Sequence, residues 1–211
     1  MNKHLVQKAH RLLEGEIGTV RKSHAGKLRV GLAYPNTYAI GMSNVGFQAV
    51  YRFWNELPDV VCERVFLPDR RDLREHQRSG SPLFTLESQT PVRELDVLAF
   101  SVTFEPDELN VIKMLDLAGI PLLSSERDAR HPLVLAGGPV TFLNPEPLSP
   151  FVEVMAVGEA EALLPTLTDV LLSCEDRDHV FDGLDGQTGF YLPGRYELDY
   201  HVGGTVASRR H

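Results

Sequence analysis

Cysteine is scarce in this chain, which holds only Cys62 and Cys174 in 211 residues. The two lie far apart and form no CxxC or CxxxCxxC motif. The chain therefore lacks a set of thiolates for a zinc ion or an iron–sulfur cluster. Two cysteines in a chain of this size also do not make the disulfide framework of a secreted protein.

Long apolar runs and an excess of basic residues are also absent. No run approaches the ~20 apolar residues that a membrane span requires, and residues 1–18 lack the apolar core of a signal peptide. The net charge of −8 argues against a general nucleic-acid-binding protein, because such proteins neutralise phosphates with Lys and Arg. An anionic ligand held by backbone N–H groups stays open. We therefore expect a cytoplasmic protein without membrane contact, for which nucleic acid is not the partner.

The sequence shows no catalytic motif. Its eight histidines form no i,i+4 pair and no HExxH, and GxSxG, a P-loop and GxGxxG after the first strand are all missing. His76 lies in the charged, turn-rich stretch 68–93, where we expect it to be solvated. These absences indicate a binding domain without a catalytic set of its own.

What the chain does contain is an alternation of apolar runs and helical periodicity. Apolar runs predict strands at 28–34, 60–66, 95–102, 132–136 and 151–157. Helical spacing predicts helices at 4–14, 43–57, 69–78, 107–118 and 160–173. Ser43 is expected to cap the second helix, and Pro165 either kinks the last helix or marks its start.

This alternation predicts an α/β fold with an open, mainly parallel five-stranded sheet and helices on both faces. Strands that are buried on both faces should be continuous apolar runs, and "VGLAY", "VLAFSV" and "LVLAGG" fit this rule. We divide the chain into an N-terminal helical extension at 1–27, the α/β domain at 28–180 and a C-terminal extension at 181–211. The last of these, rich in Gly and aromatic residues, is expected to hold a short strand.

Unusual segments follow the predicted strands, at the edge where open parallel sheets bind their ligands. Gly137 and Gly138 lack side chains, so a bulky ligand can approach their backbone closely. We expect them to floor a crevice whose walls are 35–38, 101–104 and 158–159. The candidate binding residues are Asn36, Thr37, Tyr38, Ser101, Thr103, Gly137, Gly138, Gly158 and Glu159.

Each candidate also has a purely structural interpretation, and both interpretations stay open at this point. Gly137 and Gly138 can form a tight turn, and the hydroxyls of Ser101 and Thr103 can cap a strand end. The segment 35–38 can form an Asx turn. Glu159 can simply favour the dipole of the helix that it opens.

Five segments, in this order, resemble the N-terminal region of a family of radical SAM proteins of uncharacterised activity with a cobalamin-binding-like domain. They lie at 30–55, 63–69, 86–122, 135–148 ("LAGGPVTFLNPEPL") and 157–165 ("VGEAEALLP"). The resemblance covers about residues 15–200. It implies a Rossmann-like fold of the cobalamin-binding type, followed by a radical SAM barrel that carries the CxxxCxxC motif.

The resemblance further implies that this chain is a piece of a longer protein and is not catalytic alone. The four-iron cluster and S-adenosylmethionine are expected only in a C-terminal radical SAM domain, which is the expected partner. Ser101, Thr103, Gly137 and Gly138 match the parts of cobalamin domains that hold the nucleotide tail of the cofactor. The cobalt-ligating His of the DxHxxG motif has no counterpart, because the corresponding loop reads "PNTYAIGMSN".

The sequence leaves three candidate functions for this domain. The first is an accessory domain that binds cobalamin or keeps a relict of its crevice. The second is a structural or substrate-recruiting domain that packs on the barrel without any cofactor. The third, a free-standing nucleotide-binding enzyme, is disfavoured by the absent phosphate loop.

Overall fold

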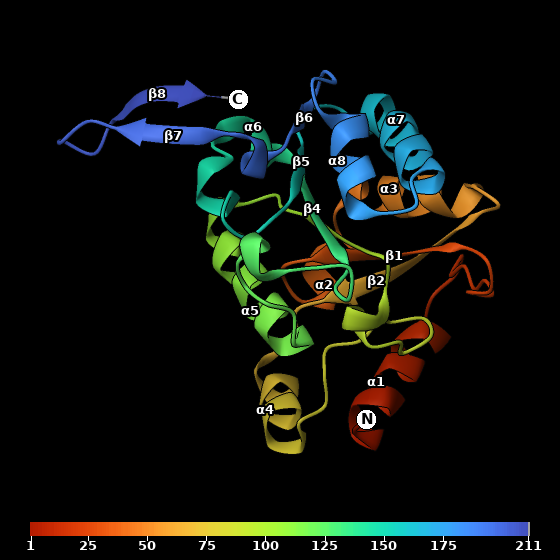
Figure 1. Ribbon diagram of the computed structural model, residues 1–211. Helices are drawn as coiled ribbons and strands as arrows, with labels where there is room; N and C mark the ends of the chain where they lie inside the picture. The colour runs from red at the N-terminus through yellow and green to blue at the C-terminus, as the bar shows by residue number, and fades with distance from the viewer. Residues whose placement is uncertain (211) are drawn as a thin grey trace.

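The computed structural model describes residues 1–210, without the side chains of Leu198, Tyr200 and Arg209. One open sheet forms its centre, in the order β2-β1-β3-β4-β5-β6 (Figure 1). The strands are β1 (Leu28–Tyr34), β2 (Val60–Phe66), β3 (Val97–Ser101), β4 (Leu133–Gly137), β5 (Val154–Ala156) and β6 (Phe190–Tyr191). The first five pair in parallel and β6 pairs antiparallel to β5. The predicted α/β class with a mainly parallel sheet is confirmed, and β6 adds a short sixth strand.

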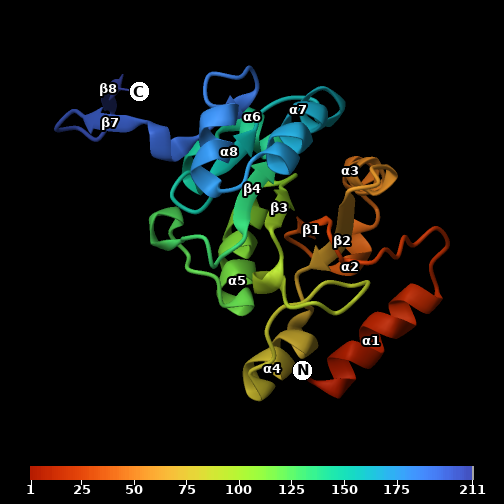
Figure 2. The ribbon, with the colours of Figure 1, turned by 45° about the vertical axis from the view of Figure 1, so that its right-hand side comes forward.

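Eight α-helices surround the sheet within the described residues. They are α1 (Lys3–Glu14), α2 (Tyr38–Gly41), α3 (Val45–Glu56), α4 (Arg70–Ser79), α5 (Glu108–Ala118), α6 (Pro139–Leu143), α7 (Ala160–Ser173) and α8 (Arg177–Leu184). A separate hairpin of β7 (Glu197–Tyr200) and β8 (Val206–Arg210) extends away from the body (Figures 1 and 2). No helix among the described residues is long and apolar enough to cross a membrane.

Alternate residues of the strands feed two separate cores, one on each face of the sheet. Val97 and Ala99 of β3 face a core made with α3, α7 and α8, whereas Leu98 and Phe100 face a core made with α5 and α6. Because β1 and β3 are neighbours that do not follow each other in the chain, the strand order reverses between them. Such a switch point is where open α/β sheets place ligands.

Edge strand β2 is covered by the N-terminal extension and by the loop at 83–90. Arg64 of β2 is buried and forms ion pairs with Glu16 and Glu87, each at 2.6 Å. The backbone N–H of Leu86 donates to the Arg64 carbonyl at 2.7 Å. These contacts satisfy an edge that would otherwise be free to pair with another chain.

Several local predictions need correction. Asn44, not Ser43, caps α3, because its Oδ1 accepts from the Phe47 N–H at 2.8 Å. Pro165 does not start α7, which already begins at Ala160 and runs through the proline. His76 is not solvated but 4% exposed, since Nδ1 donates to the Ser81 carbonyl at 2.9 Å and the ring packs near Phe84.

Three short helices among the described residues, α2, α6 and α8, had no counterpart in the prediction. α6 follows the Gly-Gly tip directly, and α8 spans the predicted domain boundary at 180/181. Leu184 and Leu192, beyond that boundary, are buried in the same core as β1 and β4. The sheet and its core therefore extend to residue 192.

Candidate cofactor pocket

A pocket of about 450 Å³ opens between α3, α7 and the carboxyl ends of β3, β4 and β5. Its floor is the face of the sheet that α3 and α7 cover (Figure 1). Its walls are mostly apolar, with Val50 and Trp54 from α3 and Leu163 and Leu167 from α7. Its volume lies within the range of ~300–1,000 Å³ that is usual for small-ligand sites.

The pocket exists because this face of the sheet changes from large to small residues toward the carboxyl edge. Deeper positions carry Val97, Leu133, Leu135 and Val154, which fill the core. The next positions on the same face, two residues further along each strand, are Ala99, Ser101, Gly137 and Ala156. Gly46, Ala49 and Ala160 on the facing helices are small as well. The helices therefore stand over a floor that they do not fill.

Gly137 and Gly138 have different roles at the tip of β4. A Cβ on Gly137 would meet only Ala156, at 3.6–3.7 Å, which is ordinary contact. Gly138 has φ +107°, and a Cβ there would lie 2.6 Å from the carbonyl oxygen of Val102. The first glycine leaves pocket volume open, and the second allows two backbone segments to approach each other. For Gly138 this contact agrees with the structural interpretation of the pair, in which the glycine serves a tight turn.

Few polar groups face the pocket, and they come from the tips of β3 and β5. The Asn44 amide donates to the Thr103 hydroxyl at 3.3 Å. The Ser101 hydroxyl has no hydrogen-bond partner among the described residues. The Glu159 carboxylate stands at the N-terminus of α7 without a side-chain capping bond. Trp54 is anchored, since its Nε1–H donates to the Thr168 hydroxyl at 3.0 Å.

Comparison with known proteins gives the family. The family described as radical SAM proteins, N-terminal, matches residues 46–193, well over half of the chain. The chain belongs to this family of radical SAM N-terminal domains. No curated protein matches the chain. The match confirms the radical SAM part of the resemblance, and cobalamin binding stays a prediction.

The radical SAM N-terminal domain brings six of the nine predicted residues together in one pocket. They are Ser101, Thr103, Gly137, Gly138, Gly158 and Glu159. Gly158 allows close packing, because a Cβ there would lie 2.9 Å from Leu163 Cδ1.

The other three predicted residues lie elsewhere, so 35–38 forms no wall of this pocket. The Asn36 amide donates to the Asp107 carboxylate at 2.9 Å, which ties the tip of β1 to the start of α5. Thr37 and Tyr38 line a different cavity near α1. The Tyr38 hydroxyl donates to Glu16 at 2.6 Å, and burial together with this bond raises its pKa to about 12.

Several wall residues were not anticipated, above all Trp54, Ala49, Phe142 and Ala160. The sequence does carry one usable signal for them. Small residues occur at matching heights on neighbouring predicted strands, at 99, 101, 137 and 156. That pattern becomes visible only when the strand order and register are known.

The rim of the domain at this edge is acidic and apolar. Segments 35–44, 101–110, 137–149 and 156–161 contain no Lys or Arg. Exposed large apolar residues gather on the same segments and on the start of α3 and α5: Ile40, Val45, Phe104, Leu109, Phe142 and Leu143. Exposed apolar residues that gather in this way mark an interaction site. No group of three or more His, Cys, Asp or Glu side chains that could hold a metal occurs among the described residues.

Proposed function

We propose that this domain is an accessory domain of a radical SAM protein that holds the nucleotide tail of cobalamin in the pocket between α3 and α7. The supporting observation is the open floor formed by small residues at the carboxyl ends of β3, β4 and β5. The pocket is deep, mostly apolar and free of basic residues, which suits the neutral aromatic base that ends the tail. A relict of such a crevice would have the same shape and would not retain the cofactor.

The residues fit the tail but offer no protein ligand for cobalt. The loop after β1 holds neither His nor Cys, and no His lines the pocket. Cobalamin bound here would keep its cobalt free of protein side chains from that loop. When bound, the cofactor supplies the radical or group-transfer chemistry of its metal.

The side chains of the domain have three tasks in this proposal. Trp54 and Leu167 give an apolar surface for an aromatic ring. The hydroxyls of Ser101 and Thr103 orient polar edges of the ligand. Phe142, 53% exposed at the mouth, shields the pocket from water once a ligand covers it.

The partner in this proposal is the radical SAM domain of the same protein, facing the carboxyl edge. The acidic and apolar rim fits a partner surface that is apolar and basic. The same rim also supports the second candidate function, a domain that only packs on the barrel or recruits substrate. The two functions differ in whether the pocket retains a cofactor.

Retention of hydroxocobalamin after desalting separates these two functions. Wild-type protein should keep the cobalamin absorbance. Gly137→Val should lose it, because a branched side chain fills the floor with only ordinary contact to Ala156. Gly194→Val is the matched control, since a Cβ there meets nothing within 4 Å and φ is not positive. Absence of retained cobalamin in a wild-type protein that melts cooperatively would leave only the packing function.

The chain itself should hold no iron–sulfur cluster. Only Cys62 and Cys174 are present, and burial raises the pKa of Cys62 well above its ordinary value. Anaerobic reconstitution with iron and sulfide should therefore give no four-iron absorbance and no cleavage of S-adenosylmethionine. A stable four-iron cluster on this chain would contradict the assignment of that chemistry to another domain.

A further inference from the structure

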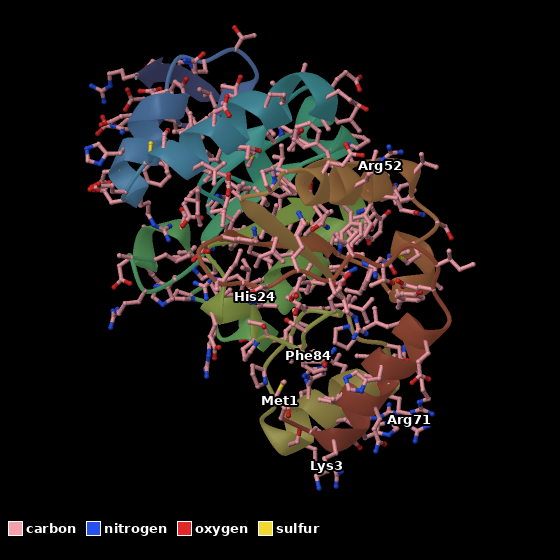
Figure 3. The ribbon with its side chains drawn as sticks, turned by 90° about the vertical axis from the view of Figure 1, so that its right-hand side faces the viewer. Met1, Lys3, His24, Arg52, Arg71 and Phe84 are labelled. Atoms are coloured by element: carbon pink, nitrogen blue, oxygen red, sulfur yellow. The ribbon has the colours of Figure 1, made fainter. Side chains whose placement is uncertain are left out.

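A second cavity, of about 370 Å³, lies between α1, α4 and the loop that contains Phe84. It shares no lining residue with the pocket between α3 and α7. Figure 3 looks onto this side of the molecule, with Phe84 labelled close to α1 and α4. Leu5 and Ala9 of α1 line it together with Phe66 and Phe84, and the two phenylalanines pack against the small core cluster that contains Ala9. The lining is therefore apolar and aromatic, and suited to a flat ring.

His76 is the polar group of this cavity that can orient a ligand by a hydrogen bond. The ring is 4% exposed, and Nδ1 lies 2.9 Å from the Ser81 carbonyl oxygen. A carbonyl oxygen only accepts, so Nδ1 carries the proton. Burial lowers the pKa of His76, and the ring is neutral at pH 7, with an unprotonated Nε2. No hydrogen bond to Nε2 occurs among the described residues. Nε2 is also not one of their fully buried unpartnered atoms, so the donor group of a ligand can reach it.

The charges beside the cavity favour a donor over an anion. Asp69 and Asp72 share a single cation, Lys8, which lies 2.7 Å from Asp69 and also contacts Asp72. The guanidinium of Arg64 also reaches the wall, but two glutamates already neutralise it. Lys8 and Arg64 together face four carboxylates, so the local balance is two negative charges in excess.

We propose that this cavity is a binding site for a small aromatic amine, with its ring between Phe66 and Phe84 and an N–H donated to Nε2 of His76. The ring-lined walls favour an aromatic ligand. The acceptor and the excess negative charge select for an amine and against a carboxylate on that ring. This site is separate from the proposed cobalamin pocket, and its test does not depend on whether cobalamin binds there.

Calorimetric titration with two matched probes tests the proposal at pH 7. Tryptamine carries an indole ring with a cationic amine, and indole-3-acetate carries the same ring with a carboxylate. Tryptamine should bind the wild type, and indole-3-acetate should give no binding heat. His76→Phe should weaken tryptamine by about tenfold or more, the usual effect of losing a hydrogen bond to a charged group. Ala9→Leu should do the same by filling the cavity from α1.

Two further variants locate the probe. Gly137→Val, which fills the pocket between α3 and α7, and Gly194→Val, remote from both, should bind tryptamine like the wild type. If His76→Phe fails to melt cooperatively, Ala9→Leu carries the test, because it removes no polar group from the cavity. Its own melt is recorded as well, since Ala9 also packs with Leu13 and Leu86. The proposal is overturned if tryptamine gives no heat at millimolar concentration, if both probes bind equally, or if neither cavity variant weakens tryptamine.

Discussion

The two edges of the central sheet are built in opposite ways. At the carboxyl edge the segments after β1, β3, β4 and β5 carry no Lys or Arg, expose apolar side chains and surround an open pocket. At the amino edge arginines are paired with carboxylates: Arg29 with Asp96, and Arg127 and Arg177 both with Glu153.

These contacts tie the loops of the amino edge to one another, beside a hollow of about 750 Å³ that Arg29, Asp96 and Arg177 help to line. Arg127 is fully buried, lies 2.6 Å from Glu153 and also donates to the carbonyls of Pro121, Leu122 and Phe151. Desolvation lowers the pKa of Arg127 and raises that of Glu153. The cluster therefore fixes loop positions more than it adds net stability. The amino edge is therefore held by largely buried ion pairs, whereas the carboxyl edge carries none of these arginines and exposes apolar side chains.

The largest loss of folding free energy should come from removing the carboxylate that Arg127 and Arg177 share at the amino edge. Glu153→Ala leaves two arginines without their carboxylate, so we expect a loss of about 3–5 kcal/mol, as for one partner removed from a buried pair. Urea denaturation measures it. A loss no larger than that of an exposed substitution would show that this cluster does not hold the amino edge together.

A smaller loss of stability should distinguish Gly138 from Gly137 at the carboxyl edge. Gly138→Ala should cost about 1–3 kcal/mol, because it combines a left-handed φ with a clash against the Val102 carbonyl. Gly137→Ala, in ordinary contact with Ala156, should cost less than about 1 kcal/mol. Thermal melting of the pair tests this. Equal losses would mean that both glycines serve only the turn.

A weak pH effect should mark the surface part of the amino edge. Arg130 beside Asp128 holds the pKa of that carboxyl well below its ordinary value of 3.8. Because its pKa is depressed in the folded state, the ionised Asp128 carboxylate stabilises the fold above pH 3.8. This stabilisation is lost as the pH falls below that value. The difference in melting temperature between wild type and Arg130→Ala should therefore shrink below pH 3.8. Arg93→Ala, exposed at the same edge and without an ion pair among the described residues, should show no such trend.

The smallest effect should come from the exposed apolar rim. Phe104 is 58% exposed, so Phe104→Ser should change the free energy of unfolding by no more than ~0.5 kcal/mol. Urea denaturation of the isolated domain measures it. A clear destabilisation would show that Phe104 packs within the domain and is not available to a partner.

The sequence predicted the sheet because most strands of the parallel core are largely apolar, as in "LRVGLAY" and "VLAFS". β2, with Glu63 and Arg64 in its middle, is the exception. It missed α6 because the helix is only five residues long and begins with the sequence Pro-Val-Thr, which resembles a loop. It placed His76 in solvent because the charged neighbours on α4 conceal how closely α1 and the 83–86 loop pack against that helix.

The strand tips that line the pocket could be predicted from the sequence, but its helical walls could not, because they depend on three-dimensional packing. The rule that ligands bind at strand carboxyl ends predicted the tips of β3, β4 and β5, and the structure gathers these tips around one pocket. The same rule included 35–38, but Asn36 is drawn to Asp107 and the chain then turns toward α1. The wall formed by Trp54 and Ala160 depends on how α3 and α7 stand over the sheet, and a one-dimensional pattern does not contain that information.

Quenching of Trp54 fluorescence by hydroxocobalamin tests the central claim most directly. Trp54 is the only tryptophan of the chain and lines the pocket between α3 and α7. We predict saturable quenching for the wild type and for Gly194→Val, and none beyond light absorption by the ligand for Gly137→Val. Quenching that does not saturate, or that Gly137→Val leaves unchanged, would contradict a cobalamin site in this pocket.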